Sequence, residues 1–94
     1  MAAPGVTFHV FGLLRDCTGG RSELSLAAPT VRAAFEHLER AEPALYRNIC
    51  DETGAVRRHL NVFVNDDNVR FRNGIDTPLA PGDVVTVLPA VSGG

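Results

Sequence analysis

The residues of this sequence best suited to chemistry are the last two, Gly93 and Gly94. We expect Gly94 to end the chain, so that its carboxylate is the reactive group on an arm without side chains. Glycine has no Cβ, so its backbone can lie close to another protein and its carbonyl stays open to attack. A partner enzyme could activate such a carboxylate and present it to a nucleophile. Val91 and Ser92 would span the gap between the folded body and that active site.

The other reactive side chains show no pattern typical of catalysis or metal binding. Cys17 and Cys50 have no His or second Cys at ligand spacing, so we expect two reduced thiols. Residues 18–21 contain two glycines but lack the Gly-Lys-Ser/Thr ending of a phosphate loop, and they predict a hairpin turn. Three scattered histidines are expected at the surface: His9, His37 and His59. We therefore expect no catalytic residue, no metal, no bound cofactor and no enzymatic activity.

The composition predicts one folded domain over residues 1–94, with a tail over residues 89–94. Hydrophobic residues make up 45% of the chain and charged residues 21%, as in ordinary globular domains. The net charge of −2 gives no electrostatic reason to expect a nucleic-acid or membrane partner. Residues 1–5 do not have the pattern of a secretory signal, and no apolar run approaches the ~20 residues of a membrane span. We expect a cytoplasmic protein.

The elements that position the C-terminal arm can be read from the spacing of apolar residues. Period-two alternation predicts strands over residues 6–10 and 23–26, joined as an antiparallel hairpin by a loop over residues 15–21. Thr30 is the expected N-cap of a helix, which Pro43 ends or interrupts. The remaining expectations are a short turn at 44–46, a loop at 50–59, a strand at 60–64, a turn at 65–68, a short strand at 69–71, a turn at 81–83 and a last strand at 84–88.

This element order predicts an α+β layer fold. A single helix covers one face of a four- to five-stranded mixed sheet and leaves the other face more exposed. The first and last strands are both apolar enough to be central, and we expect them side by side and parallel. The arrangement is then a ubiquitin-like β-grasp. A ferredoxin-like order is the alternative, but it would require a second helix.

The chain resembles the small ubiquitin-like sulfur carriers of the MoaD/ThiS group. The last of four similar stretches is the most specific, because it combines a Gly-Asp turn, a strand, a proline and the final Gly-Gly. Residues 57–71 look most like the actinobacterial carriers of the CysO type, which serve cysteine biosynthesis. The four stretches are residues 11–16, 30–31, 62–69 and 77–94.

The resemblance implies a mechanism and two kinds of partner. An E1-like adenylyltransferase/sulfurtransferase would consume ATP to adenylate Gly94, and a sulfur source would then convert the adenylate to a thiocarboxylate. A downstream sulfur-accepting synthase would receive the sulfur. Two alternatives remain open: the small subunit of a molybdopterin-synthase-like complex, and a ubiquitin-like protein modifier joined to lysines through Gly94.

Two surfaces are candidates for partner docking. If Val62 and Val64 point toward the helix, the other sheet face carries apolar side chains that a solvated sheet would not need: Phe11, Phe63, Val84 and Leu88. Alternatively, the loop over residues 46–58 could fold over part of this face. A second set could steer acidic partners, or could simply form a basic edge that discourages aggregation: Arg57, Arg58, Arg70 and Arg72.

Overall fold

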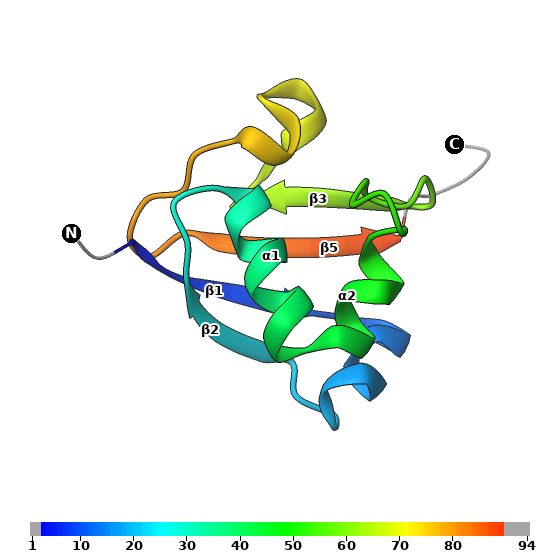
Figure 1. Ribbon diagram of the computed structural model, residues 1–94. Coiled ribbons are helices and arrows are strands. Elements are labelled where there is room, and N and C mark those ends of the chain that lie inside the picture. Colours follow the sequence, from blue (N-terminus) through cyan, green and yellow to red (C-terminus); the bar gives the residue numbers. More distant parts are fainter. Residues whose placement is uncertain (1–2, 90–94) are drawn as a thin grey trace.

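The computed structural model describes residues 3–89 and has two layers, a five-stranded mixed sheet and helices on one of its faces (Figure 1). The strands lie in the order β2-β1-β5-β3-β4. The α-helices α1 (Val31–Ala41) and α2 (Pro43–Ile49) lie on the same side of the sheet. The strand bounds are β1 Gly5–Val10, β2 Glu23–Ala27, β3 Leu60–Val64, β4 Asp67–Asn68 and β5 Val84–Pro89. Three 3₁₀ helices complete the fold: η1 Gly12–Thr18, η2 Val69–Phe71 and η3 Gly74–Asp76.

The strand pairing confirms the ubiquitin-like β-grasp arrangement that the element order predicts. β1 and β5 are adjacent and parallel, and Val10 pairs with Val87. β2 and β3 pair antiparallel with β1 and β5, respectively. The predicted alternation is also observed, because Phe8, Val85 and Val87 are fully buried under the helices. The last long strand, β5, therefore runs through the middle of the sheet.

The helix α1 begins at a side-chain cap and packs its apolar face on the sheet. The Thr30 hydroxyl accepts a hydrogen bond from the Ala33 N–H at 3.1 Å, which confirms the predicted N-cap. The ring of Phe35 meets Phe8 edge-on, with 6.2 Å between ring centroids. The helix ends at Ala41, and Pro43 begins α2, because proline is tolerated in a first helical turn but not in a helix interior.

The sequence predicts a single helix, whereas a second α-helix, α2, follows α1 on the same face of the sheet; the strand order is nevertheless that of a β-grasp. Four segments also differ from the sequence predictions. The predicted loop over residues 15–21 is largely η1, followed by a turn whose two glycines, Gly19 and Gly20, both have positive φ. Residues 44–46 belong to α2, because the core buries Leu45 and Ile49 on one face of that helix. The predicted tail residue Pro89 belongs to β5 and pairs with Leu60.

The fourth difference concerns Val69–Phe71, which forms η2 and not the predicted short strand. The side-chain oxygen of Asn68 accepts a hydrogen bond from the Arg70 N–H at 2.9 Å, and this local bond favours a turn over an extended ladder. The predicted turn over residues 65–68 is also shorter than expected, because Asp67–Asn68 form the short strand β4. No helix between residues 3 and 89 is long and apolar enough to cross a membrane.

A polar clasp holds the start of β5. The Asn65 side chain donates to the Asp83 carboxylate at 3.0 Å and accepts from the Val84 N–H at 3.0 Å. The second carboxylate oxygen of Asp83 accepts from the Ala80 N–H at 2.8 Å. Asn65 has a φ of 55°, in the left-handed region that asparagine tolerates better than most residues. The clasp thus joins the β3–β4 turn to the turn before β5.

The clasp predicts a loss of stability in acid. Hydrogen bonds from the Ala80 N–H and the Asn65 side chain lower the pKa of Asp83, so its stabilisation is complete above the unfolded pKa of about 3.9. That stabilisation disappears as the pH falls through the lower, folded-state pKa. We expect Asp83→Asn to have a lower melting temperature than the wild type at about pH 6. As the pH falls toward about 2.5, the melting temperature of the variant should decline less steeply than that of the wild type.

Thermal unfolding followed by circular dichroism across this pH range measures the effect. Asp66→Asn is the matched control, because Asp66 lies in the neighbouring turn and is exposed. The control should keep the wild-type slope. Equal slopes for Asp83→Asn and the wild type would contradict the assignment.

Candidate docking face and the base of the C-terminal arm

The described part of the chain ends at the last residue of its central strand, β5. Pro89 is the last described residue, is exposed, and pairs with Leu60 at the start of β3. β1 also ends near this edge, because Val10 lies opposite Val87. The described chain therefore ends between β1 and β3, at one edge of the sheet. The predicted attachment site Gly94 and the tail residues Val91, Ser92 and Gly93 lie outside the described residues.

The outer face of the sheet carries the predicted apolar cluster. Thr86 is central to it, with His9 opposite on β1 and Phe63 opposite on β3. Val84 and Leu88 follow Thr86 at two-residue spacing on the same face of β5, and both are partly exposed. Phe11, just after β1, is 45% exposed, and its ring lies 5.8 Å from that of His9. We call Phe11, Phe63, Val84 and Leu88 the outer apolar face.

The segment that could have covered this face lies on the opposite side of the sheet. Leu45, Ile49 and Cys50 are buried in the core under the helices. The loop after Cys50 borders a hollow whose walls include Glu39 of α1 and Tyr46 of α2. Residues 46–58 therefore belong to the helical layer, and the alternative that they cover the outer face is wrong.

Phe71 extends the apolar surface and was missed by the sequence interpretation. Its side chain is 84% exposed, and it borders a hollow together with Phe63 and Arg72. A strand over residues 69–71 would place Val69 and Phe71 on one face, whereas η2 buries Val69 and exposes Phe71. A phenylalanine between two arginines, directly after a turn, was the available signal for an exposed aromatic.

The structure brings together three of the four predicted arginines. Arg57, Arg58 and Arg70 line one groove beside β3. Arg72 lies instead in the hollow next to Phe63, where it forms an ion pair with Asp67 at 3.0 Å. Arg72 therefore lies in different surroundings from the other three arginines and does not belong to the same basic site.

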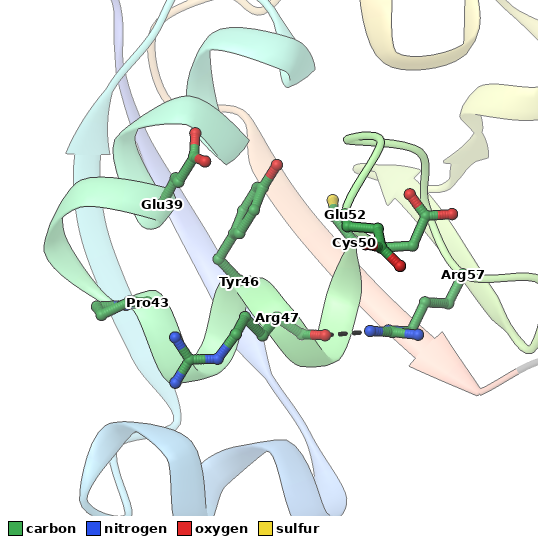
Figure 2. Close-up of a pocket in the computed structure, with 8 residues that line it drawn as sticks. Glu39, Pro43, Tyr46, Arg47, Cys50, Glu52 and Arg57 are labelled. Carbon is green, nitrogen blue, oxygen red and sulfur yellow. Dashed lines mark hydrogen bonds between the residues drawn. The ribbon is translucent and has the colours of Figure 1, made fainter.

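A hollow with several charged side chains surrounds the end of α2, and Cys50 is among the residues that line it (Figure 2). Arg57 crosses one side of it and donates through Nε to the Arg47 carbonyl at 3.0 Å. Burial and then the neighbouring Asp51 carboxylate raise the pKa of Cys50 to about 11, so at neutral pH it is a thiol and a poor nucleophile. Cys17 and Cys50 are both free, as predicted. Within residues 3–89, no three His, Cys, Asp or Glu side chains are grouped to hold a metal ion.

The strand order, the parallel central pair and the one-sided helices define a ubiquitin-like β-grasp protein. A model of the ThiS family matches residues 8–94, which includes the five residues beyond Pro89. The chain therefore belongs to the ThiS family. This confirms the family that the sequence motifs predict.

Individual relatives agree with this assignment. Sulfur carrier protein CysO of Mycobacterium tuberculosis is 38% identical over 91 residues, which are 95% of this chain and 98% of that protein. Its crystal structure matches with a TM-score of 0.83 over 92% of this chain and 99% of that chain. A chain of the BexX/CysO complex of Amycolatopsis orientalis is 34% identical, with a TM-score of 0.83 over 95% of this chain and 99% of that one.

A third similarity is to a protein with a different name. The small archaeal modifier protein SAMP1 of Methanosarcina acetivorans is 31% identical, with a TM-score of 0.82 over 100% of this chain and 99% of that chain. Sulfur carriage is nevertheless the function named for the CysO relatives and for a putative sulfur carrier of Archaeoglobus fulgidus that is 29% identical over 80% of this chain and 85% of that protein. The predicted function class is thereby confirmed.

Proposed function

We propose that this chain carries sulfur as a thiocarboxylate on Gly94 and donates it to the biosynthesis of small molecules, with cysteine as the first product to test. The main support is the family match, which continues through residue 94, together with the similarity to CysO. The base of the arm at the end of β5, beside an exposed apolar face, suits a terminus that enters a partner's active site. In this proposal the chain is a substrate of its partners and not an enzyme.

The chemistry needs an activated carboxylate, because direct attack by sulfur would have to expel an oxide. An oxygen of the Gly94 carboxylate would attack the α-phosphorus of ATP on an E1-like partner, and pyrophosphate would leave. Sulfide would then attack the carbonyl carbon of the acyl adenylate and displace AMP. A persulfide donor would form an acyl disulfide, which a thiol reduces to the same thiocarboxylate. The anionic product is nucleophilic at neutral pH and can pass its sulfur to an electrophile bound by a downstream synthase.

The outer apolar face and the arm have separate roles in this proposal. The face would hold the activating enzyme, and the arm would place Gly94 at ATP. ATP belongs to the partner, and this chain binds no cofactor of its own. Two free cysteines fit the reducing cytoplasm, where ATP and the partner enzymes would also be available.

Intact-protein mass spectrometry tests the proposal. The chain is incubated with an E1-like enzyme from the same genome, ATP and sulfide. We expect a mass increase equal to exchange of one oxygen for one sulfur, located in the C-terminal peptide. A chain that stays unchanged while an authentic CysO protein is converted by the same enzyme would refute the proposal.

Electrostatic steering by the basic edge gives a separate kinetic prediction. Raising the salt concentration from about 50 to about 500 mM should slow association with the activating enzyme several-fold, because exposed charges are screened. Arg58→Gln should lower the association rate at low salt. Arg72→Gln is the matched control, because Arg72 already pairs with Asp67. A stopped-flow association rate that is indifferent to salt would leave only the anti-aggregation role of these arginines.

A protein modifier is the second candidate function, supported by the similarity to SAMP1 of Methanosarcina acetivorans. In that case the acyl adenylate would be attacked by a lysine amine, and an amide to Gly94 would form. A ladder of covalent conjugates on a denaturing gel, lost on deletion of Gly94, would support this function. Thiocarboxylate formation without conjugates would support sulfur carriage alone.

A further inference from the structure

A groove of about 400 Å³ follows the edge of β3 that faces away from β5. Its floor is apolar and is formed by Val56, Leu60, Val62, Val69 and Ile75. Three arginines line it, Arg57, Arg58 and Arg70, and none of its 12 lining residues is acidic. The groove thus combines an apolar floor with positively charged walls.

The edge of β3 along this groove has no neighbouring strand among the described residues. β4 pairs only with Phe63 and Val64, so residues 60–62 are paired on the β5 side alone. Alternate residues of such an edge strand direct their N–H and C=O groups away from the sheet. The Leu60 N–H donates to the Arg57 carbonyl at 3.1 Å, and the outward groups of Val62 have no hydrogen-bond partner among the described residues. Leu60 and Val62 are only 5% and 3% exposed, so these groups lie at the floor of the groove. The open edge is about 10 Å long, at roughly 3.3 Å per residue.

Local hydrogen bonds hold both walls of the groove in place. The Asp51 carboxylate accepts from the N–H groups of Thr53 and Ala55 and so fixes the loop that leads to Arg57. The Arg57 N–H donates to the Ile49 carbonyl at 2.9 Å. On the other wall, Asn68 caps η2 and positions Arg70. The groove is therefore formed before any partner arrives, which lowers the entropic cost of binding.

The arginines of the groove have unused charge. Arg57 is in no ion pair among the described residues, but it donates to the Arg47 carbonyl and, after the hydrogen bonds from Thr53, its charge contributes to lowering the pKa of Asp51. Arg58 and Arg70 form no ion pair with any residue between 3 and 89, although both are exposed. Acidic groups on a partner would complement Arg58 and Arg70 first, with Arg57 beside them.

We propose that this groove binds an acidic, extended segment of a partner protein, which adds a short strand to β3 along residues 60–62. The segment would pair its carboxylates with Arg57, Arg58 and Arg70 and place its apolar side chains on the floor. The occupant differs from the partner surface that meets the outer apolar face. The proposal rests on the geometry of the groove and not on the chemistry of Gly94.

Backbone NMR with a synthetic peptide tests the proposal. The probe is a seven-residue peptide that alternates glutamate with valine, added to the ¹⁵N-labelled full-length chain. We expect chemical-shift changes and slower amide exchange at residues 60–62 and 69–75. Arg58→Glu combined with Arg70→Glu should raise the dissociation constant at least about tenfold. Arg15→Glu combined with Arg40→Glu, at two exposed positions outside the groove, is the charge-matched control and should have little effect.

Three results would overturn the proposal. The first is equal binding of the peptide and of a version with N-methylated backbone nitrogens, because strand addition needs the peptide N–H groups. The second is a set of shifts confined to the outer apolar face. The third is a change at residues 60–62 when residues 90–94 are removed without peptide, which would show that the chain's own C-terminal segment occupies the groove.

Discussion

Deletion of Gly94 should reduce thiocarboxylate formation by about a hundredfold or more. The deletion withdraws the reacting carbonyl by one residue, up to about 3.6 Å, and a misplacement of about 1 Å can already cost on the order of a hundredfold in rate. Gly94→Ala keeps the length of the arm but adds a methyl group beside the reacting carbon, so we expect a partial defect. An extra residue after Gly94 should block conversion unless a protease removes it. Intact mass against time, with ATP and sulfide in excess, measures each rate.

A glycine elsewhere in the chain provides the control for these variants. Gly5 begins β1, and a Cβ built there has no heavy atom within 4 Å. Gly5→Ala should therefore be converted at the wild-type rate. All variants should unfold at the wild-type temperature, which separates a loss of reach from a loss of fold. Normal conversion of a chain that ends at Gly93 would refute the assignment of Gly94 as the attachment site.

Phe63→Asp should weaken binding to the activating enzyme by about ten- to a hundredfold. Burial of a phenylalanine contributes about 1.5–3 kcal/mol, and each 1.4 kcal/mol corresponds to a factor of ten in affinity. An aspartate at this position would also have to lose water in the interface without a partner. Phe63 points away from the core and is only partly buried, so the fold should survive. Titration calorimetry with the enzyme measures the affinity, and the wild-type thermal midpoint confirms the fold.

Ser25→Asp is the matched control for this prediction. Ser25 lies on the same face of the sheet, opposite Thr7, but on the exposed strand β2 and away from the apolar cluster. Ser25→Asp introduces the same charge as Phe63→Asp. Unchanged affinity of the Ser25→Asp chain for the enzyme would therefore assign the effect of Phe63→Asp to the outer apolar face. Phe71→Asp would show how far the interface extends toward β4. Wild-type affinity of a folded Phe63→Asp chain would place the docking surface elsewhere.

The core of this fold was predictable because it depends on short-range patterns. The alternation of Phe8 and Val10 with polar neighbours, and the cap at Thr30, describe local structure that tertiary packing did not change. Residues 44–46 were harder, because apolar periodicity is recognised over windows of about 11 residues or more and α2 has only 7. Its stability comes from burial of Leu45 and Ile49 against other elements, which neighbouring residues do not reveal.

The surface features also divide into those that the local sequence determines and those that long-range packing determines. The sequence by itself determined which side chains of β3 and β5 face outward, because the period of a strand is two, and it identified Gly94 as the candidate reactive group. Only the tertiary structure separated Arg72 from Arg57, Arg58 and Arg70, exposed Phe71, and left residues 60–62 paired with β5 but without a second strand neighbour. These features depend on where η2 and the loop after Cys50 lie relative to β3. Long-range packing sets those positions, and strand periodicity carries no information about them.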